Sequence, residues 1–149
     1  MSFALLGRSG LALLATIAMP TVAVSEESQQ YQNLLTQLFA DNKTIIGQAI
    51  DAYPTGTPKI TAVIVTVPPG KDSGWHTHRV PLFIYVMEGE ITVDYGEKGK
   101  KVYKAGDTFL EAMDWPHTGI NTSNAPVIIM AVYMGVEGTP NAEAVEASQ

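Results

Sequence analysis

The sequence of 149 residues contains no cysteine, which excludes disulfide bonds and thiol chemistry. Basic residues are scarce as well, because Lys and Arg number 9 against 15 Asp and Glu. The resulting net charge of −6 makes nucleic acid and anionic membrane surfaces unfavourable partners. Beyond its N-terminus the chain has no apolar run of about 18 residues, so we expect no membrane-spanning segment there. Its hydrophobic content of 46% suffices for the core of one domain.

The first 25 residues have a composition of their own. Arg8 precedes an apolar stretch over residues 11–19, and small residues follow Pro20. A weakly basic start, a short hydrophobic core and small residues before a polar segment are typical of a secretory signal. We therefore expect residues 1–25 to be a signal peptide, cleaved after Ala23 or Ser25, and the protein to be periplasmic or secreted, with no membrane contact after cleavage. The alternative is an uncleaved anchor, although a spanning helix needs about 20 apolar residues.

A stripe of apolar residues at helical spacing follows the signal. It consists of Tyr31, Leu34, Leu35, Leu38 and Phe39. Spacing of this kind predicts an amphipathic helix over residues 28–40, within an N-terminal helical segment of residues 26–44. We expect the helix to pack on the outside of the main domain or against a second subunit.

The remainder of the chain has the pattern of strands. Short β-branched or alternating segments are bounded by Gly and Pro, and they predict strands at 60–67, 83–87, 90–95, 101–103, 108–111, 118–121 and 127–133. Many short strands at regular spacing indicate an all-β sandwich or small barrel, here over residues 45–135. Residues 136–149 are small and acidic, and we expect them to form a mobile tail.

The chain has only three histidines, and all of them fall in two short motifs. His76 and His78 are two residues apart, so on a strand their side chains point to the same face. His117 follows 39 residues later. Imidazole is the commonest metal ligand in proteins. The three side chains can therefore hold one ion if His117 arrives on a neighbouring strand.

The spacing of these motifs resembles that of the cupin superfamily. Its first motif, G-x5-H-x-H-x3,4-E-x6-G, matches Gly70, His76, His78 and Gly89, and its second, G-x5-P-x-G-x2-H-x3-N, matches Gly106, His117 and Asn121. The resemblance covers residues 45 to 135. It implies a double-stranded β-helix, or jelly-roll barrel, with His76, His78 and His117 as metal ligands.

The chain departs from the motifs at three positions. Leu82 stands where the first motif has its glutamate, and Ala112 and Asp114 replace the Pro and Gly of the second. Three histidines without that carboxylate suit Fe, Mn, Ni, Cu or Zn, and we expect one such divalent ion. The alternative is a hydrogen-bonded polar cluster without metal.

Several further residues near the motifs are candidates for the site. Glu111 is the best candidate for a replacement carboxylate or a general base, and Asp114 is a weaker one. Asn121 is expected to make a structural hydrogen bond. The residues expected to line a pocket for a small organic ligand are Trp75, Leu82, Tyr85, Met113 and Trp115.

Two functions follow from this pattern, and the sequence leaves both open. The first is an enzyme acting on a small molecule: cupin-like enzymes with three histidines include dioxygenases of thiols and β-diketones, and isomerisation or decarboxylation would use the same geometry. The second is a non-catalytic module that binds a small molecule or metal. Metal-free epimerase-like chemistry is a third and weaker alternative. The resemblance also implies a homodimer through the outer strands.

Overall fold

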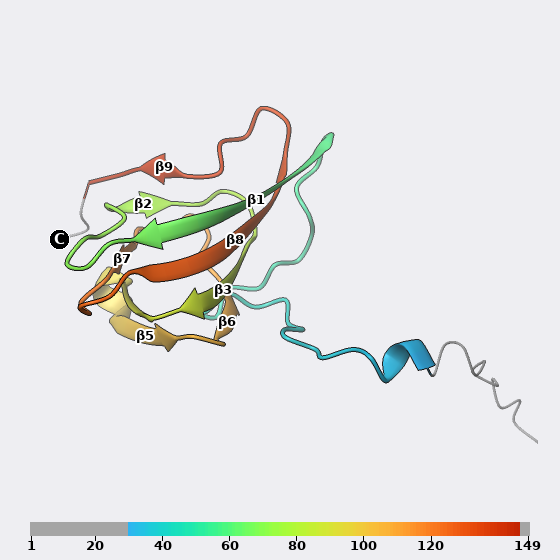
Figure 1. Cartoon of the computed structure of the whole chain (residues 1–149). Helices are drawn as coiled ribbons and strands as arrows, with labels where there is room; N and C mark the ends of the chain where they lie inside the picture. The colour runs from blue at the N-terminus through green and yellow to red at the C-terminus, as the bar shows by residue number, and fades with distance from the viewer. Residues whose placement is uncertain (1–29, 147–149) are drawn as a thin grey trace, which may run out of the picture. The chain divides into compact units, whose positions relative to one another are not determined.

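The structure is a computed structural model that describes residues 30–146. These residues contain nine β-strands (Figure 1). The expected signal peptide, residues 1–25, lies outside the described residues, so its cleavage stays a prediction. The strands are β1 (Pro58–Val67), β2 (His76–Thr77), β3 (Leu82–Glu88), β4 (Glu90–Asp94), β5 (Lys100–Lys104), β6 (Thr108–Leu110), β7 (Thr118–Ile120), β8 (Val127–Val136) and β9 (Glu143–Ala144), with a 3-10 helix η1 (Gly96–Lys98) before β5.

The strands form two main antiparallel sheets. One sheet has the order β1-β8-β3-β6, and the other has the order β5-β4-β7. One isolated bridge joins Asp72, which precedes β2, to Ile120 of β7, and another joins His76 of β2 to His117, which precedes β7. On its other side β2 pairs with β9. This arrangement confirms the predicted all-β jelly roll.

The core lies between the two sheets. Along β3 the side chains of Leu82, Ile84 and Val86 are buried, whereas the intervening Phe83 and Tyr85 are only half-buried. Ile91 and Val93 of β4, Phe109 of β6 and Val127, Ile129 and Ala131 of β8 belong to the same hydrophobic cluster. Residues 82–86 are all apolar, so the pairing of the strand, and not the sequence pattern, decides which of them face the interior.

The outer face of the four-stranded sheet is apolar as well. Ile60 and Ile64 of β1 are 62% and 58% exposed, and they pair in register with Met134 and Met130 of β8. The homodimer expected through outer strands stays a prediction.

The N-terminal helix is much shorter than expected. Within the described part of the N-terminal segment, residues 30–44, only 30–32 are helical, and residues 35–40 have no helical structure. None of the helices among the described residues is long and apolar enough to cross a membrane. Farther along, the Leu38 carbonyl accepts a hydrogen bond from the Thr108 hydroxyl, and the Phe39 ring lies 5.7 Å from that of Phe83. A short helix needs tertiary packing to be stable, and the sheet instead binds residues 38–39 in a non-helical conformation.

The C-terminal segment also differs from the expected mobile tail. Residues of β9 pair with β2, the Val145 amide donates to the Trp75 carbonyl, and Arg79 forms an ion pair with Glu143 at 3.0 Å. The small, acidic composition suggested mobility, but main-chain pairing with a strand edge requires no apolar side chains.

Candidate metal centre

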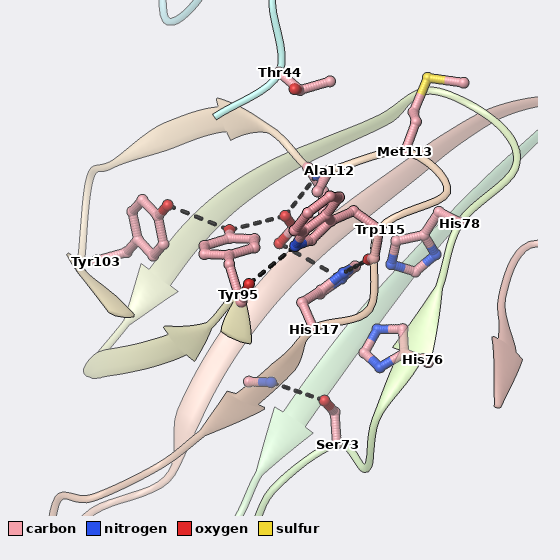
Figure 2. A network of polar contacts seen from close by, with 12 residues as sticks. Thr44, Ser73, His76, His78, Tyr95, Tyr103, Ala112, Met113, Trp115 and His117 are labelled. Atoms are coloured by element: carbon pink, nitrogen blue, oxygen red, sulfur yellow. Dashed lines mark hydrogen bonds and ion pairs between the residues drawn. The ribbon is translucent and has the colours of Figure 1, made fainter. Parts of the chain in front are cut away.

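The three histidines converge because the backbone pairs their segments. His76 and His117 exchange two main-chain hydrogen bonds of 3.0 Å, and His78 follows two residues after His76 on the same face. One ring nitrogen from each histidine lies within 4.8 Å of the others, and Figure 2 shows the rings turned toward one another. The predicted convergence of these residues is thus confirmed, and their ring centroids are 4.5 to 5.1 Å apart.

Main-chain carbonyls determine which ring nitrogen carries the proton. The Nδ1 atoms of His76, His78 and His117 each lie 2.8 Å from a carbonyl oxygen, and the acceptors belong to Gly74, Asn141 and Trp115. A carbonyl only accepts, so each Nδ1 carries the hydrogen and each Nε2 keeps its lone pair. The buried Nε2 of His117 has no hydrogen-bond partner among the described residues. Histidine ligands to metals are oriented in this way, so the three residues fit a metal ion.

Burial also keeps these histidines neutral. Loss of solvent lowers the pKa of His76 and His117, although the Gly74 and Trp115 carbonyls oppose the shift. The same cause lowers the pKa of His78 to about 3. Neutral imidazole is the form that binds a metal, so the site needs no deprotonation near pH 7.

Glu111 points into the same space. It lies directly after β6, and its amide donates to the Leu82 carbonyl. Glu111 is therefore opposite Leu82, the residue that replaces the motif glutamate, on the adjacent strand. The residue is 5% exposed, and its Oε2 lies 3.9 Å from Nε2 of His117. The sequence left the direction of this side chain open, and the structure brings its carboxylate beside the histidines.

The hydroxyl groups of two tyrosines extend a hydrogen-bond network from this carboxylate into the core. Oε1 of Glu111 accepts hydrogen bonds from the Tyr95 hydroxyl at 2.8 Å and the Ala112 amide at 2.6 Å. The Tyr103 hydroxyl lies 3.3 Å from that of Tyr95 (Figure 2). Burial raises the pKa of both tyrosines, so they remain neutral donors. Sequence reasoning missed this network, since no motif links residues on separate strands.

Burial raises the pKa of Glu111 from 4.5 to about 7, although hydrogen bonds from Ala112 and Tyr95 and the charge of Lys101 oppose the shift. In metal-free protein, this carboxyl stabilises the fold below pH 4.5 and loses that contribution as pH rises through 7. The histidines act oppositely, because their lowered pKa values cost stability as pH falls below 6.5.

Glu111→Gln should therefore make the metal-free protein more sensitive to acid. We expect its free energy of unfolding to fall by about 2 kcal/mol more than that of wild type between pH 7 and pH 5. Urea unfolding with a chelator present measures this, and Glu88→Gln, at an exposed carboxylate, is the matched control. If the free energy of unfolding changed equally with pH in wild type and Glu111→Gln, the raised pKa of Glu111 would be contradicted.

A cavity of about 420 Å³ opens beside the histidines and Glu111. Its walls are mostly apolar side chains of the two sheets, and no Lys or Arg lines it among the described residues. Trp75 and Leu82 line the cavity as predicted. Small organic ligands bind in cavities of this size, with apolar walls and a few polar groups.

Three of the predicted pocket residues lie elsewhere. Tyr85 is on the opposite face of β3 from Ile84, which lines the cavity. The Trp115 indole donates to the Tyr95 carbonyl and has the Lys98 ammonium 4.6 Å above its ring. Met113 is not among the lining residues, and its side chain points away from the histidines (Figure 2). Closeness in sequence to the motifs was the reason for choosing them, and it does not specify direction.

Two further placements complete the site. Asp114, the weaker carboxylate candidate, is exposed, has a φ of 48°, and is not part of the histidine cluster. Tyr133, which the sequence gave no reason to select, lines the cavity with its ring 5.6 Å from that of His78. It pairs with Leu82 across β8 and β3, so only knowledge of strand register would have identified it.

Residues 63–133 match the family model of the Cupin domain. These residues form a domain of the cupin superfamily. No curated protein sequence matches this cupin.

Solved structures share the fold of this cupin at low identity. Oxalate decarboxylase from Lactobacillus farciminis, in a formate complex, has a TM-score of 0.51 and 21% identity over 58% of this chain and 26% of that chain. The DMSP lyase DddQ from Ruegeria pomeroyi has a TM-score of 0.51 and 19% identity, over 58% and 43%. The polyketide cyclase RemF from Streptomyces resistomycificus has a TM-score of 0.51 and 19% identity, over 60% and 63%. This cupin thus spans less than two thirds of each chain, and the likeness concerns the fold.

Proposed function

We propose that this cupin holds one divalent metal ion through His76, His78 and His117 and binds a small organic molecule beside it. The observation that carries the proposal is the common tautomer of the three rings, which presents three Nε2 lone pairs from a buried cluster. A divalent ion bound there would supply Lewis acidity and a positive charge for an anionic ligand group. Fe, Mn, Ni, Cu and Zn all suit imidazole ligands.

The lining of the cavity narrows the class of ligand. Among the residues that the structure describes, its ionisable groups are the three histidines, Glu111 and Tyr133, and no Lys or Arg lines it to pair with a phosphate or a second carboxylate. A negative group on the ligand can therefore be met only at the histidine centre. We infer a mainly apolar ligand with one chelating group, such as a β-diketone, a phenolic compound or a thiol.

Glu111 is positioned to receive a proton from such a ligand. Tyr95 and the Ala112 amide hold Oε1, which leaves Oε2 beside His117 with no hydrogen bond from the described residues. Because the histidine lone pairs are required for the ion, Glu111 is the remaining base in the cavity, and we propose that it acts as the general base.

The chemistry that we favour is oxygenation of the bound molecule. An oxalate decarboxylase, a DMSP lyase and a polyketide cyclase share this fold, so decarboxylation or isomerisation on the same centre is a second candidate. A non-catalytic binding module is the alternative to both.

We further propose that the protein is secreted or periplasmic, which mass spectrometry of the mature N-terminus in the exported fraction tests.

Ligand binding and oxygen uptake test these functions. Protein loaded with Fe(II) is titrated without air against acetylacetone, catechol and cysteine, and then exposed to oxygen. We expect one equivalent of at least one probe to bind and oxygen to be consumed, with turnover reduced about 100-fold in Glu111→Gln and unchanged in Glu88→Gln. Binding without oxygen uptake would favour the non-catalytic module, and no binding of any probe would overturn the proposed ligand class.

A further inference from the structure

The C-terminal strap, defined as residues 139–146, reaches the metal centre through its main chain. The carbonyl of Asn141 accepts the hydrogen bond from Nδ1 of His78 at 2.8 Å, across 63 residues of sequence. The carbonyls that orient His76 and His117 come instead from positions two residues away in sequence. His78 is therefore the one histidine of the three whose orientation depends on a distant segment.

The strap also forms part of the cavity. In the β2–β9 pairing, Ala144 lies opposite His76, and opposed residues on paired strands point to the same face. Ala142 and Ala144 accordingly line the cavity, whereas Glu143 points to the other side and pairs with Arg79. The Val145 amide, which donates to the Trp75 carbonyl, holds the end of the strap in place (Figure 1 shows β9 beside β2).

We propose that the strap is a working part of the metal centre, which holds His78 in the Nδ1–H tautomer and covers the histidines from one side. When the strap is in place, His78 lines the cavity and the residue is 2% exposed. When the strap is displaced, His78 loses its acceptor and the histidine cluster opens to solvent. The attachment consists mainly of main-chain hydrogen bonds and one surface ion pair, so release is a local event that leaves the two sheets paired.

The test compares two truncations. One ends at Gly138 and removes the strap, and the other ends at Glu146 and serves as the matched control. In metal-free protein, nitrogen NMR of the imidazoles should show that His78 loses its fixed Nδ1–H tautomer in the shorter chain, whereas His76 and His117 keep theirs. Modification of His78 by diethyl pyrocarbonate, located by peptide mass spectrometry, should become faster in the same chain.

Metal affinity gives a second readout. The shorter chain should bind Zn(II) 10- to 100-fold more weakly, as expected when a partner that orients a histidine ligand is lost. The inference rests on the proposed metal centre, but the tautomer and the modification rate are measured without metal, so the two can fail separately. If the shorter chain does not fold, Val145→Pro removes the amide that donates to Trp75 and tests the same attachment. An unchanged tautomer and modification rate at His78 would overturn the role of the strap.

Discussion

The double variant His76→Ala/His117→Ala should be purified with less than about a tenth of an equivalent of metal, against about one equivalent for wild type. Two of the three ring nitrogens within 4.8 Å of one another are removed, and a lone His78 cannot chelate an ion. Elemental analysis after expression with ample metal measures this difference. The metal found in wild type would also indicate whether the chemistry is redox or Lewis-acid.

Thr77→Ala is the matched control, because Thr77 stands between His76 and His78 on the opposite face of the strand. It should keep its metal, and circular dichroism should show that all variants remain folded. Equal metal content in the double variant and wild type would place the ion elsewhere. Absence of metal from wild type would favour the hydrogen-bonded polar cluster instead.

Replacement of Asn121 by alanine should lower the free energy of unfolding by about 3 kcal/mol or more. Its fully buried amide donates to the carbonyls of Val67 and Ala125, and its oxygen accepts from both the amide and the hydroxyl of Ser123. The side chain thereby ties the end of β1 to the loop between β7 and β8. Alanine removes all four hydrogen bonds and leaves the carbonyl of the buried Val67 without this donor, which costs more than the loss of the bonds alone.

Urea unfolding of Asn121→Ala measures this cost. Asn124→Ala, in the same loop and exposed, is the control and should change stability by less than about 0.5 kcal/mol. A loss of under about 1 kcal/mol for Asn121→Ala would show that water or a local shift replaces these hydrogen bonds. The structural role expected for Asn121 from the sequence would then need revision.

Local patterns predicted most of this fold, and nonlocal pairing accounts for what they missed. The β-branched run of β1 was sufficient to predict a strand, and the spacing of His76 and His78 predicted a shared face. Strand register decided the rest. It placed Tyr133 opposite Leu82 and brought β9 beside β2, and neither pairing leaves a periodic signal in the sequence.

The helix and the pocket show the same limit. A stripe of apolar residues predicted a helix to residue 40, but the preference of Phe39 for Phe83 depends on a surface that appears only in the folded sheet. Tyr85 and Trp115 were assigned to the pocket by their nearness to motifs, whereas the pleat of β3 and the bond to Tyr95 turned them away.

The acceptors that orient the three histidines are all peptide carbonyls, belonging to Gly74, Trp115 and Asn141. A substitution at Trp115 or Asn141 changes the side chain but leaves the carbonyl in place, whereas Gly74 has a φ of 71° that other residues rarely adopt. The orientation of His78 and His117 therefore tolerates a change of side chain at the residue that supplies the acceptor, provided that the backbone conformation is kept. Related proteins with the same centre are then expected to share its three histidines, the glycine and the main-chain course, while the side chains at the other two acceptor positions vary.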